Sequence, residues 1–132
     1  MAPGFAMNVL LDACALLALA QGDLPPRAAS ALRTAAEANV SAVTVWEVAI
    51  KVAAGKLRLA EPPIQWFQGL AERYVLRELP LDAGAACAAA GLPLIHRDPF
   101  DRLLVAVAHA HALAVLTSDK NIAKYPGVKT LW

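Results

Sequence analysis

Short, continuously apolar runs alternate along the chain with longer segments whose apolar residues recur every three or four positions. The first run, residues 8–11, ends at an aspartate and is typical of a strand buried on both faces. Further strands are predicted in four later runs: 40–43, 75–81, 114–119 and 128–132. Helical periodicity, bounded by glycine and proline, predicts helices at 13–22, 25–39, 44–55, 64–74, 82–93 and 98–113.

Strands that alternate with helices predict an α/β fold with a central, mainly parallel sheet covered by helices on both faces. In such a sheet every strand ends at the same edge, and the helix that follows begins there. No repeat or linker interrupts the pattern, so we expect a single domain over residues 1–132. Residues 1–6 are interpreted as a dispensable N-terminal extension, because Met7 directly precedes the first predicted strand.

Composition narrows the class of protein. The 132 residues are 58% hydrophobic and 17% charged, and the net charge of +1 lacks the strong basic field of a duplex-binding protein. Cys14 and Cys87 have no CxxC spacing and apolar neighbours, which predicts reduced, buried thiols. Neither a signal peptide nor an apolar run of about 18 residues is found, so we expect a cytoplasmic protein without a membrane span.

Acidic residues stand where predicted strands end and helices begin. Asp12 follows the first strand, Asp119 closes another, and Glu47 and Asp101 open two helices, with Asp98 as a fifth acid. Because these positions share one edge of the sheet, we expect the acids to converge. Carboxylates at close range repel one another unless a cation lies between them, and oxygen-only ligands favour Mg²⁺ or Mn²⁺ over zinc. The sequence therefore predicts a divalent metal site.

Each acid also has a purely structural explanation. Asp98 is a candidate helix N-cap before a proline, and Thr44 with Glu47 matches a capping box. Asp12 could cap the helix that follows it, and Asp119 could form an Asx turn before a short helical segment. Taken singly, each acid is better explained by capping than by metal binding, so the prediction rests on their convergence.

Four stretches resemble the PIN-domain ribonucleases, and most closely the VapC toxins of bacterial type II toxin–antitoxin modules. They span almost the whole chain and read NVLLDACALLAL, SAVTVWEVAIKVAAGKLRL, LPLIHRDPFDRLLVAVA and LAVLTSDKNIAKYPGVKTLW. The resemblance implies a PIN-like three-layer α/β/α fold and a Mg²⁺-dependent endoribonuclease that hydrolyses RNA through metal-activated water. It also implies a homodimer and a groove for a segment of a cognate antitoxin.

The resemblance further implies a role for each acid. Asp12 and Asp101 are expected to bind the metal directly. Asp119 and Glu47 are expected to act through water or on a second ion, and Asp98 as an auxiliary ligand. All of these but Asp98 correspond to the acids that the family uses for metal binding and catalysis.

One position departs from the family pattern. PIN proteins commonly have threonine or serine after the first aspartate, where this chain has Ala13. The missing hydroxyl puts the efficiency of cleavage in doubt. Thr117 and Ser118, beside the fourth acid, are candidates to replace that hydroxyl.

Several other residues are open to two interpretations. His109 and His111 are expected to lie near the negative end of a helix dipole rather than to bind metal. His96 is expected to be a loop histidine bonded to backbone, with RNA contact as the alternative. Trp46 and Phe100 are expected in the core, with stacking on a base as the alternative.

Other functions also fit parts of the sequence. A PIN nuclease or a non-catalytic PIN-like binding module outside a toxin–antitoxin pair would carry the same acids. A receiver-like phosphoacceptor would use Asp12, Ser118 and Lys120, but it does not account for Glu47 or Asp101. Lys51 suits equally a contact with phosphate and an ordinary helical ion pair with Glu47.

Overall fold

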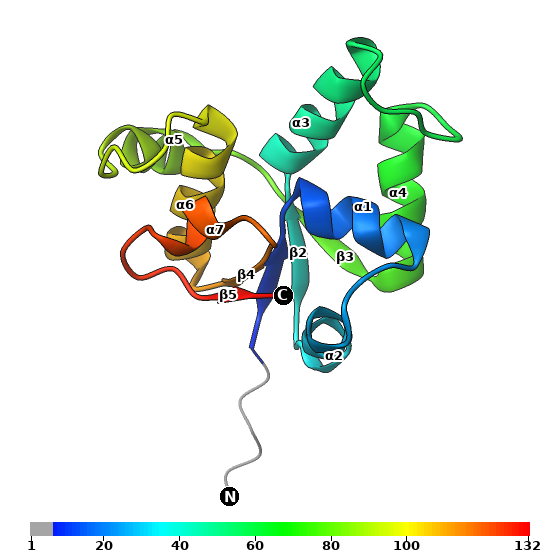
Figure 1. The fold of residues 1–132 in the computed structure, drawn as a ribbon, viewed down its shortest axis with the longest axis horizontal. Coiled ribbons are helices and arrows are strands. Elements are labelled where there is room, and N and C mark those ends of the chain that lie inside the picture. The colour runs from blue at the N-terminus through cyan, green and yellow to red at the C-terminus, as the bar shows by residue number, and fades with distance from the viewer. Residues whose placement is uncertain (1–6) are drawn as a thin grey trace, which may run out of the picture.

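A five-stranded parallel sheet forms the centre of the computed structural model, which describes residues 7–132 (Figure 1). The sheet order is β3-β2-β1-β4-β5, and every neighbouring pair is parallel. The strands are β1 (Val9–Leu11), β2 (Ala38–Ser41), β3 (Leu76–Leu79), β4 (Ala114–Leu116) and β5 (Thr130–Leu131). All carboxyl ends therefore lie at one edge. The predicted extension, residues 1–6, lies outside the described residues.

Helices cover both faces of the sheet, which confirms the predicted three-layer α/β/α fold (Figure 1). One face carries α1 (Ala13–Gln21), α2 (Pro26–Thr34) and α4 (Pro63–Tyr74). The other carries α5 (Ala83–Ala90), α6 (Pro99–His111) and α7 (Lys120–Ala123). Helix α3 (Ala42–Ala53) begins at the carboxyl edge and contacts α1, α4 and α6, so it bridges the two outer layers.

Strand β1 shows why its sequence is continuously apolar. Side chains alternate between the two faces of a strand, so Leu10 packs into the core under α5 and α6, whereas Val9 and Leu11 pack under α1 and α4. All three are fully buried, as the apolar run predicts for a central strand of a parallel sheet.

The segment around β2 differs from the sequence prediction. The helix expected over 25–39 ends at Thr34, and the strand expected at 40–43 occupies 38–41. Ser41 caps α3 by accepting a hydrogen bond from the Val43 backbone, so the helix begins two residues earlier than expected and the Thr44 capping box is wrong. Pairing of β2 with both β1 and β3 overrides the helical propensity of this alanine-rich stretch.

The structure also bears on the predictions about the two cysteines and about membrane-spanning helices. Cys14 and Cys87 are both free, but both are exposed, so the expectation of buried thiols is wrong. The prediction was wrong because it was based on the alanine-rich neighbours of the two cysteines. Helices α1 and α5 each have a solvent-facing side. Within residues 7–132, no helix combines the length and apolar character that crossing a membrane requires.

Candidate metal centre

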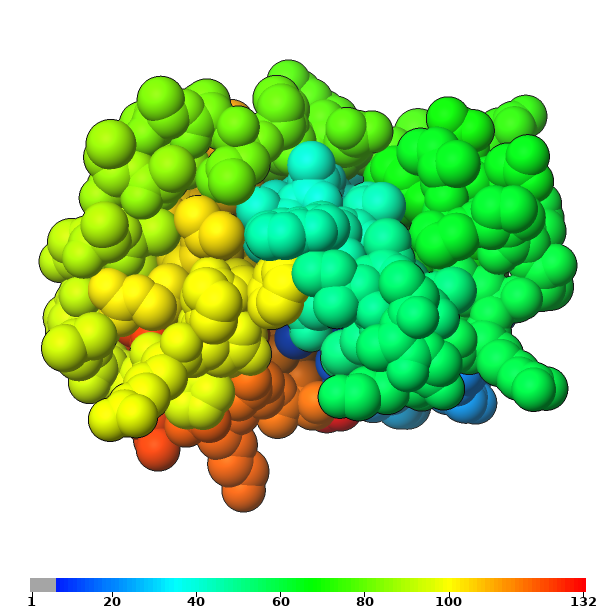
Figure 2. Space-filling model, turned by 90° about the horizontal axis from the view of Figure 1, so that it is seen from above, coloured from blue at the N-terminus to red at the C-terminus, as the bar shows by residue number. Residues whose placement is uncertain are grey.

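All five predicted acids line one cleft at the carboxyl edge of the sheet. The cleft has a volume of about 370 Å³ and lies between the start of α1, the first turns of α3 and the start of α6. Seen from above, α3 and the start of α6 face each other, and the start of the chain's first helix lies deep between them (Figure 2). The acids that line it are Asp12, Glu47, Asp98, Asp101 and Asp119.

Asp12 is held by both of its carboxylate oxygens. Oδ1 accepts a hydrogen bond of 2.8 Å from the Ala15 backbone, which makes Asp12 the N-cap of α1 as predicted. Oδ2 accepts a hydrogen bond from the hydroxyl of Thr117. Burial raises the pKa of Asp12 to about 6; these two hydrogen bonds oppose the rise, and the charges of Glu47 and Asp119 add to it.

Thr117 supplies the hydroxyl that the sequence lacks at Ala13. Besides donating to Asp12, its oxygen accepts a 2.9 Å hydrogen bond from the Asp119 backbone, so one side chain joins two acids of the cleft. Ser118, the other candidate, lies instead 3.1 Å from the sulfur of Cys14. The support for the first acid therefore comes from the end of the neighbouring strand β4 rather than from the next residue.

Asp119 is the N-cap of α7, and Glu47 forms an ion pair with Lys51. Asp119 accepts a 2.8 Å hydrogen bond from the Asn121 backbone and caps α7, as its expected Asx turn requires. Glu47 lies in the second turn of α3, 3.3 Å from the ammonium group of Lys51. The helical ion pair expected as one alternative for Lys51 is present, and Lys51 also lines the cleft.

The start of α6 presents the most unusual carboxyl group of the site. Asp98 is the N-cap and accepts a 2.9 Å hydrogen bond from the Phe100 backbone, with Pro99 at the first helical position, as predicted. Asp101, in the first turn, is 8% exposed, and burial raises its pKa to about 8, with the charges of Asp98 and Asp119 adding to the rise. Among residues 7–132, its Oδ2 is the one buried side-chain oxygen or nitrogen without a hydrogen-bond partner.

This donor set fits a divalent cation. Five carboxyl groups line the cleft, two of them disfavour the charged state because they are buried among negative charges, and one has a buried oxygen with no partner. A hard cation would neutralise the charges and satisfy that oxygen at once. The residues that would hold it are Asp12, Glu47, Asp98, Asp101 and Asp119.

His96 lies beside two of the acids, and its closeness to Asp101 was not predicted from the sequence. Its Nδ1 accepts a 3.4 Å hydrogen bond from the Asp98 backbone, which confirms the expected backbone contact. The same atom also lies 3.4 Å from Oδ2 of Asp101. The signal in the sequence was its position two residues before Asp98, inside a turn that must close over the start of the helix. The two helix-end histidines lie in the last turn of α6, as predicted.

Trp46 is not a core residue, contrary to expectation. It is 57% exposed, and its ring meets that of Phe100 edge-on at a centroid distance of 5.3 Å. The buried residues of α3 are Val43, Thr44 and Val48, so Trp46 lies on the opposite, exposed face of the helix. Phe100 is half-buried and lines the cleft, so an aromatic pair stands beside the acids.

Comparisons with known proteins agree with this architecture. The PIN domain family matches residues 9–128. The chain is 32% identical over 108 residues to ribonuclease VapC22 of Mycobacterium tuberculosis, covering 80% of this chain and 82% of that protein. The alignment therefore includes most of both chains.

Solved structures share the fold at low sequence identity. A chain of the DNA-bound VapBC from Salmonella typhimurium superposes with a TM-score of 0.67 at 17% identity, covering 94% of this chain and 96% of that one. VapBC2 from Rickettsia felis, bound to a promoter fragment, gives 0.67 at 13% identity, with coverages of 94% and 97%. Together with the parallel sheet and the acid-lined cleft, the family match shows that this chain belongs to the PIN domain family.

Proposed function

We propose that this protein is a divalent-metal-dependent endoribonuclease and the toxin of a type II toxin–antitoxin module. The observation that carries the proposal is the cleft lined by five acids, with a buried Asp101 oxygen that lacks a partner. A 32% identical protein that bears the name ribonuclease supports RNA as the substrate. Free Cys14 and Cys87 are compatible with a cytoplasmic location.

We assign the five acids different roles in binding the cation. We assign Asp12 and Asp101 as direct ligands, because both are buried at the carboxyl edge. We assign Glu47 and Asp119 to water-mediated contacts or a second ion, and Asp98 to an auxiliary role beside its capping contact. Mg²⁺ is the proposed ion and Mn²⁺ its substitute, since carboxylates and water suit both. When bound, such an ion lowers the pKa of a water molecule and stabilises negative charge on the phosphate.

The surroundings of the cleft suit a single RNA strand better than a duplex. The net charge of +1 offers no broad basic surface, so phosphate contacts must be local, and Lys51 at the cleft is placed for one. The exposed ring of Trp46 offers a face on which an unpaired base could stack.

We further propose an antitoxin and a second copy of the chain as partners. Support for the antitoxin comes from the solved VapBC assemblies that share this fold. Support for a homodimer comes from a composition that is 58% hydrophobic and from large exposed apolar side chains. Among them are Ile64, Val75 and Leu94.

The alternatives make different predictions. A receiver-like domain would be phosphorylated on Asp12 by acetyl phosphate, and it gives no reason for Glu47 and Asp101 to line the same cleft. A non-catalytic PIN-like module would keep the cleft but cut no RNA. A PIN nuclease outside a toxin–antitoxin pair would cut RNA without an antitoxin that neutralises it.

The decisive experiment compares wild type with Asp12→Ala, in cells and with purified protein. Expressed without a partner, wild type should arrest growth and Asp12→Ala should not, because the variant loses a metal ligand. Purified wild type should cleave a pool of structured RNAs with Mg²⁺ or Mn²⁺, and the variant should be slower by at least about 10²-fold. Asp23→Ala, an exposed acid outside the cleft, is the matched control and should behave as wild type.

The assay with purified RNA can detect cleavage that is too slow to arrest growth. Ala13 lacks the usual hydroxyl, so slow turnover could hide toxicity in cells while cleavage is still measurable on purified RNA. If wild type and Asp12→Ala leave both the RNA pool and the cells equally intact, the nuclease proposal fails.

A further inference from the structure

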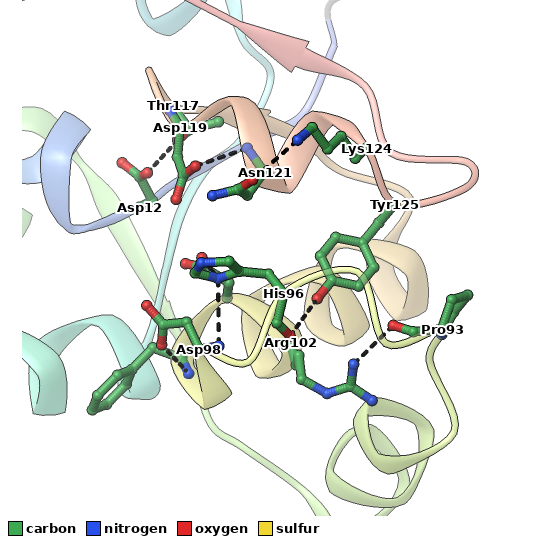
Figure 3. A network of polar contacts seen from close by, with 12 residues as sticks. Asp12, Pro93, His96, Asp98, Arg102, Thr117, Asp119, Asn121, Lys124 and Tyr125 are labelled. Atoms are coloured by element: carbon green, nitrogen blue, oxygen red, sulfur yellow. Dashed lines mark hydrogen bonds and ion pairs between the residues drawn. The ribbon is translucent and has the colours of Figure 1, made fainter.

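One histidine and two aspartates form a compact group at the start of α6. One ligand atom each from His96, Asp98 and Asp101 lies within 4.8 Å of the others, the one such group among residues 7–132. Figure 3 shows the imidazole of His96 in the space between Asp98 on one side and Asp12 with Asp119 on the other.

The buried oxygen of Asp101 indicates that a ligand belongs here. Its Oδ2 has no hydrogen-bond partner, although Nδ1 of His96 is only 3.4 Å away. A buried carboxylate oxygen without a partner is costly, and a cation shared with the nearby nitrogen would satisfy it.

The ring atom of His96 that lies near both aspartates is Nδ1. This atom accepts a hydrogen bond from the Asp98 backbone and lies 3.4 Å from Oδ2 of Asp101. At 3.4 Å this hydrogen bond is long and easily exchanged for a metal–nitrogen bond.

The loop that carries His96 is held in place from two sides (Figure 3). The hydroxyl of Tyr125, a residue that is 2% exposed, donates to the His96 carbonyl at 3.3 Å. The guanidinium of Arg102 donates to the carbonyls of Pro93 and Leu92, each at 2.9 Å. These contacts fix the backbone on both sides of the loop and so position the imidazole before any ligand arrives.

We propose that His96, Asp98 and Asp101 form a nitrogen-containing cation subsite that shares Asp98 and Asp101 with the carboxylate centre and favours Mn²⁺ over Mg²⁺. The inference rests on the proposed metal-dependent function and adds a ligand and a metal preference to it. Imidazole is a borderline donor that suits transition metals, whereas Mg²⁺ favours oxygen. A site made only of carboxylates would lack this source of discrimination.

The test reads the metal's ligands directly. Mn²⁺ bound to the full-length protein is examined by electron spin echo envelope modulation, which detects a coordinated nitrogen, and the signal is checked with ¹⁵N-histidine labelling. The variants are His96→Gln, which removes the nitrogen donor, and His109→Gln as the matched control at the far end of α6. Calorimetry gives the Kd of Mn²⁺ and Mg²⁺ for each protein, and circular dichroism verifies folding.

Wild type and His109→Gln should show the histidine-nitrogen signal, and His96→Gln should lose it. The Kd of Mn²⁺ should rise about 10- to 100-fold in His96→Gln, while that of Mg²⁺ stays close to wild type. Mn²⁺ bound without a nitrogen signal in wild type, or a signal that persists in His96→Gln, overturns the subsite but leaves the carboxylate centre and the nuclease proposal standing. Absence of any divalent binding at millimolar metal overturns the metal-dependent function and the subsite together.

Discussion

Asp101 and Asp12 make the stability of the metal-free protein depend on pH. Both carboxyl groups have a raised pKa in the folded protein, about 8 and about 6, against an ordinary value of 3.8. From about pH 4 upward the unfolded chain loses protons that the folded chain retains, so the free energy of unfolding falls as the pH rises towards 8. The metal-free protein should be most stable in mild acid, and a bound cation should remove this dependence.

Replacing Asp101 by asparagine separates its contribution to this pH dependence from that of Asp12. With EDTA at pH 8, Asp101→Asn should unfold at a higher temperature than wild type, because the buried charge is gone. Its free energy of unfolding should be larger by an amount on the order of a few kcal/mol. At pH 5 the two should be similar, and the variant should not cleave RNA. Melting curves at both pH values, with Asp23→Asn as control, measure this.

Wild type should gain stability from Mg²⁺ or Mn²⁺ at pH 8, and Asp101→Asn should gain less. An EDTA-treated wild type that melts at the same temperature at pH 5 and pH 8 would contradict the burial of an unpaired charge.

Asp98, at the start of α6, is both a helix cap and a possible metal ligand. Asp98 caps the helix through the Phe100 backbone and belongs to the group of possible ligands with His96. Asparagine keeps the cap and loses the charge, whereas alanine loses both. A comparison of the two variants therefore separates the cap from the charge.

In EDTA at pH 5, Asp98→Ala should be less stable than Asp98→Asn by about 1 kcal/mol, the usual contribution of an N-cap. Urea unfolding measures the difference. Asp98→Asn should impair cleavage less than Asp12→Asn or Asp101→Asn; if it is the most damaging of the three, the assignment of direct and auxiliary ligands is reversed.

At the scale of the whole molecule, the exposed apolar side chains predict association. Val75 is 82% exposed and Ile64 is 54% exposed, at the two ends of α4. A chain that is 58% hydrophobic buries such side chains most readily against another protein surface. Light scattering at micromolar concentration should therefore give the mass of a dimer, and a monomer over the whole range would contradict the prediction.

Much of this protein follows from local sequence. The alternation of apolar runs with helical periodicity predicts the parallel sheet, because strand and helix periodicities differ within a few residues. The caps at Asp12, Asp98 and Asp119 are equally local, since each bonds a backbone group two or three residues ahead. Their place at one sheet edge follows from the topology, so the acid cleft could be expected from the sequence.

Contacts between distant segments decided the rest. Strand β2 begins two residues before the predicted position because it pairs with β1 and β3. Helix α3 packs through Val43, Thr44 and Val48, which leaves Trp46 exposed. Thr117 reaches Asp12 from 105 residues away, and His96 reaches Asp101 through a loop that Tyr125 and Arg102 hold. Hydrogen-bond pairing and burial act between surfaces that meet only after folding, so no periodicity in the sequence records them.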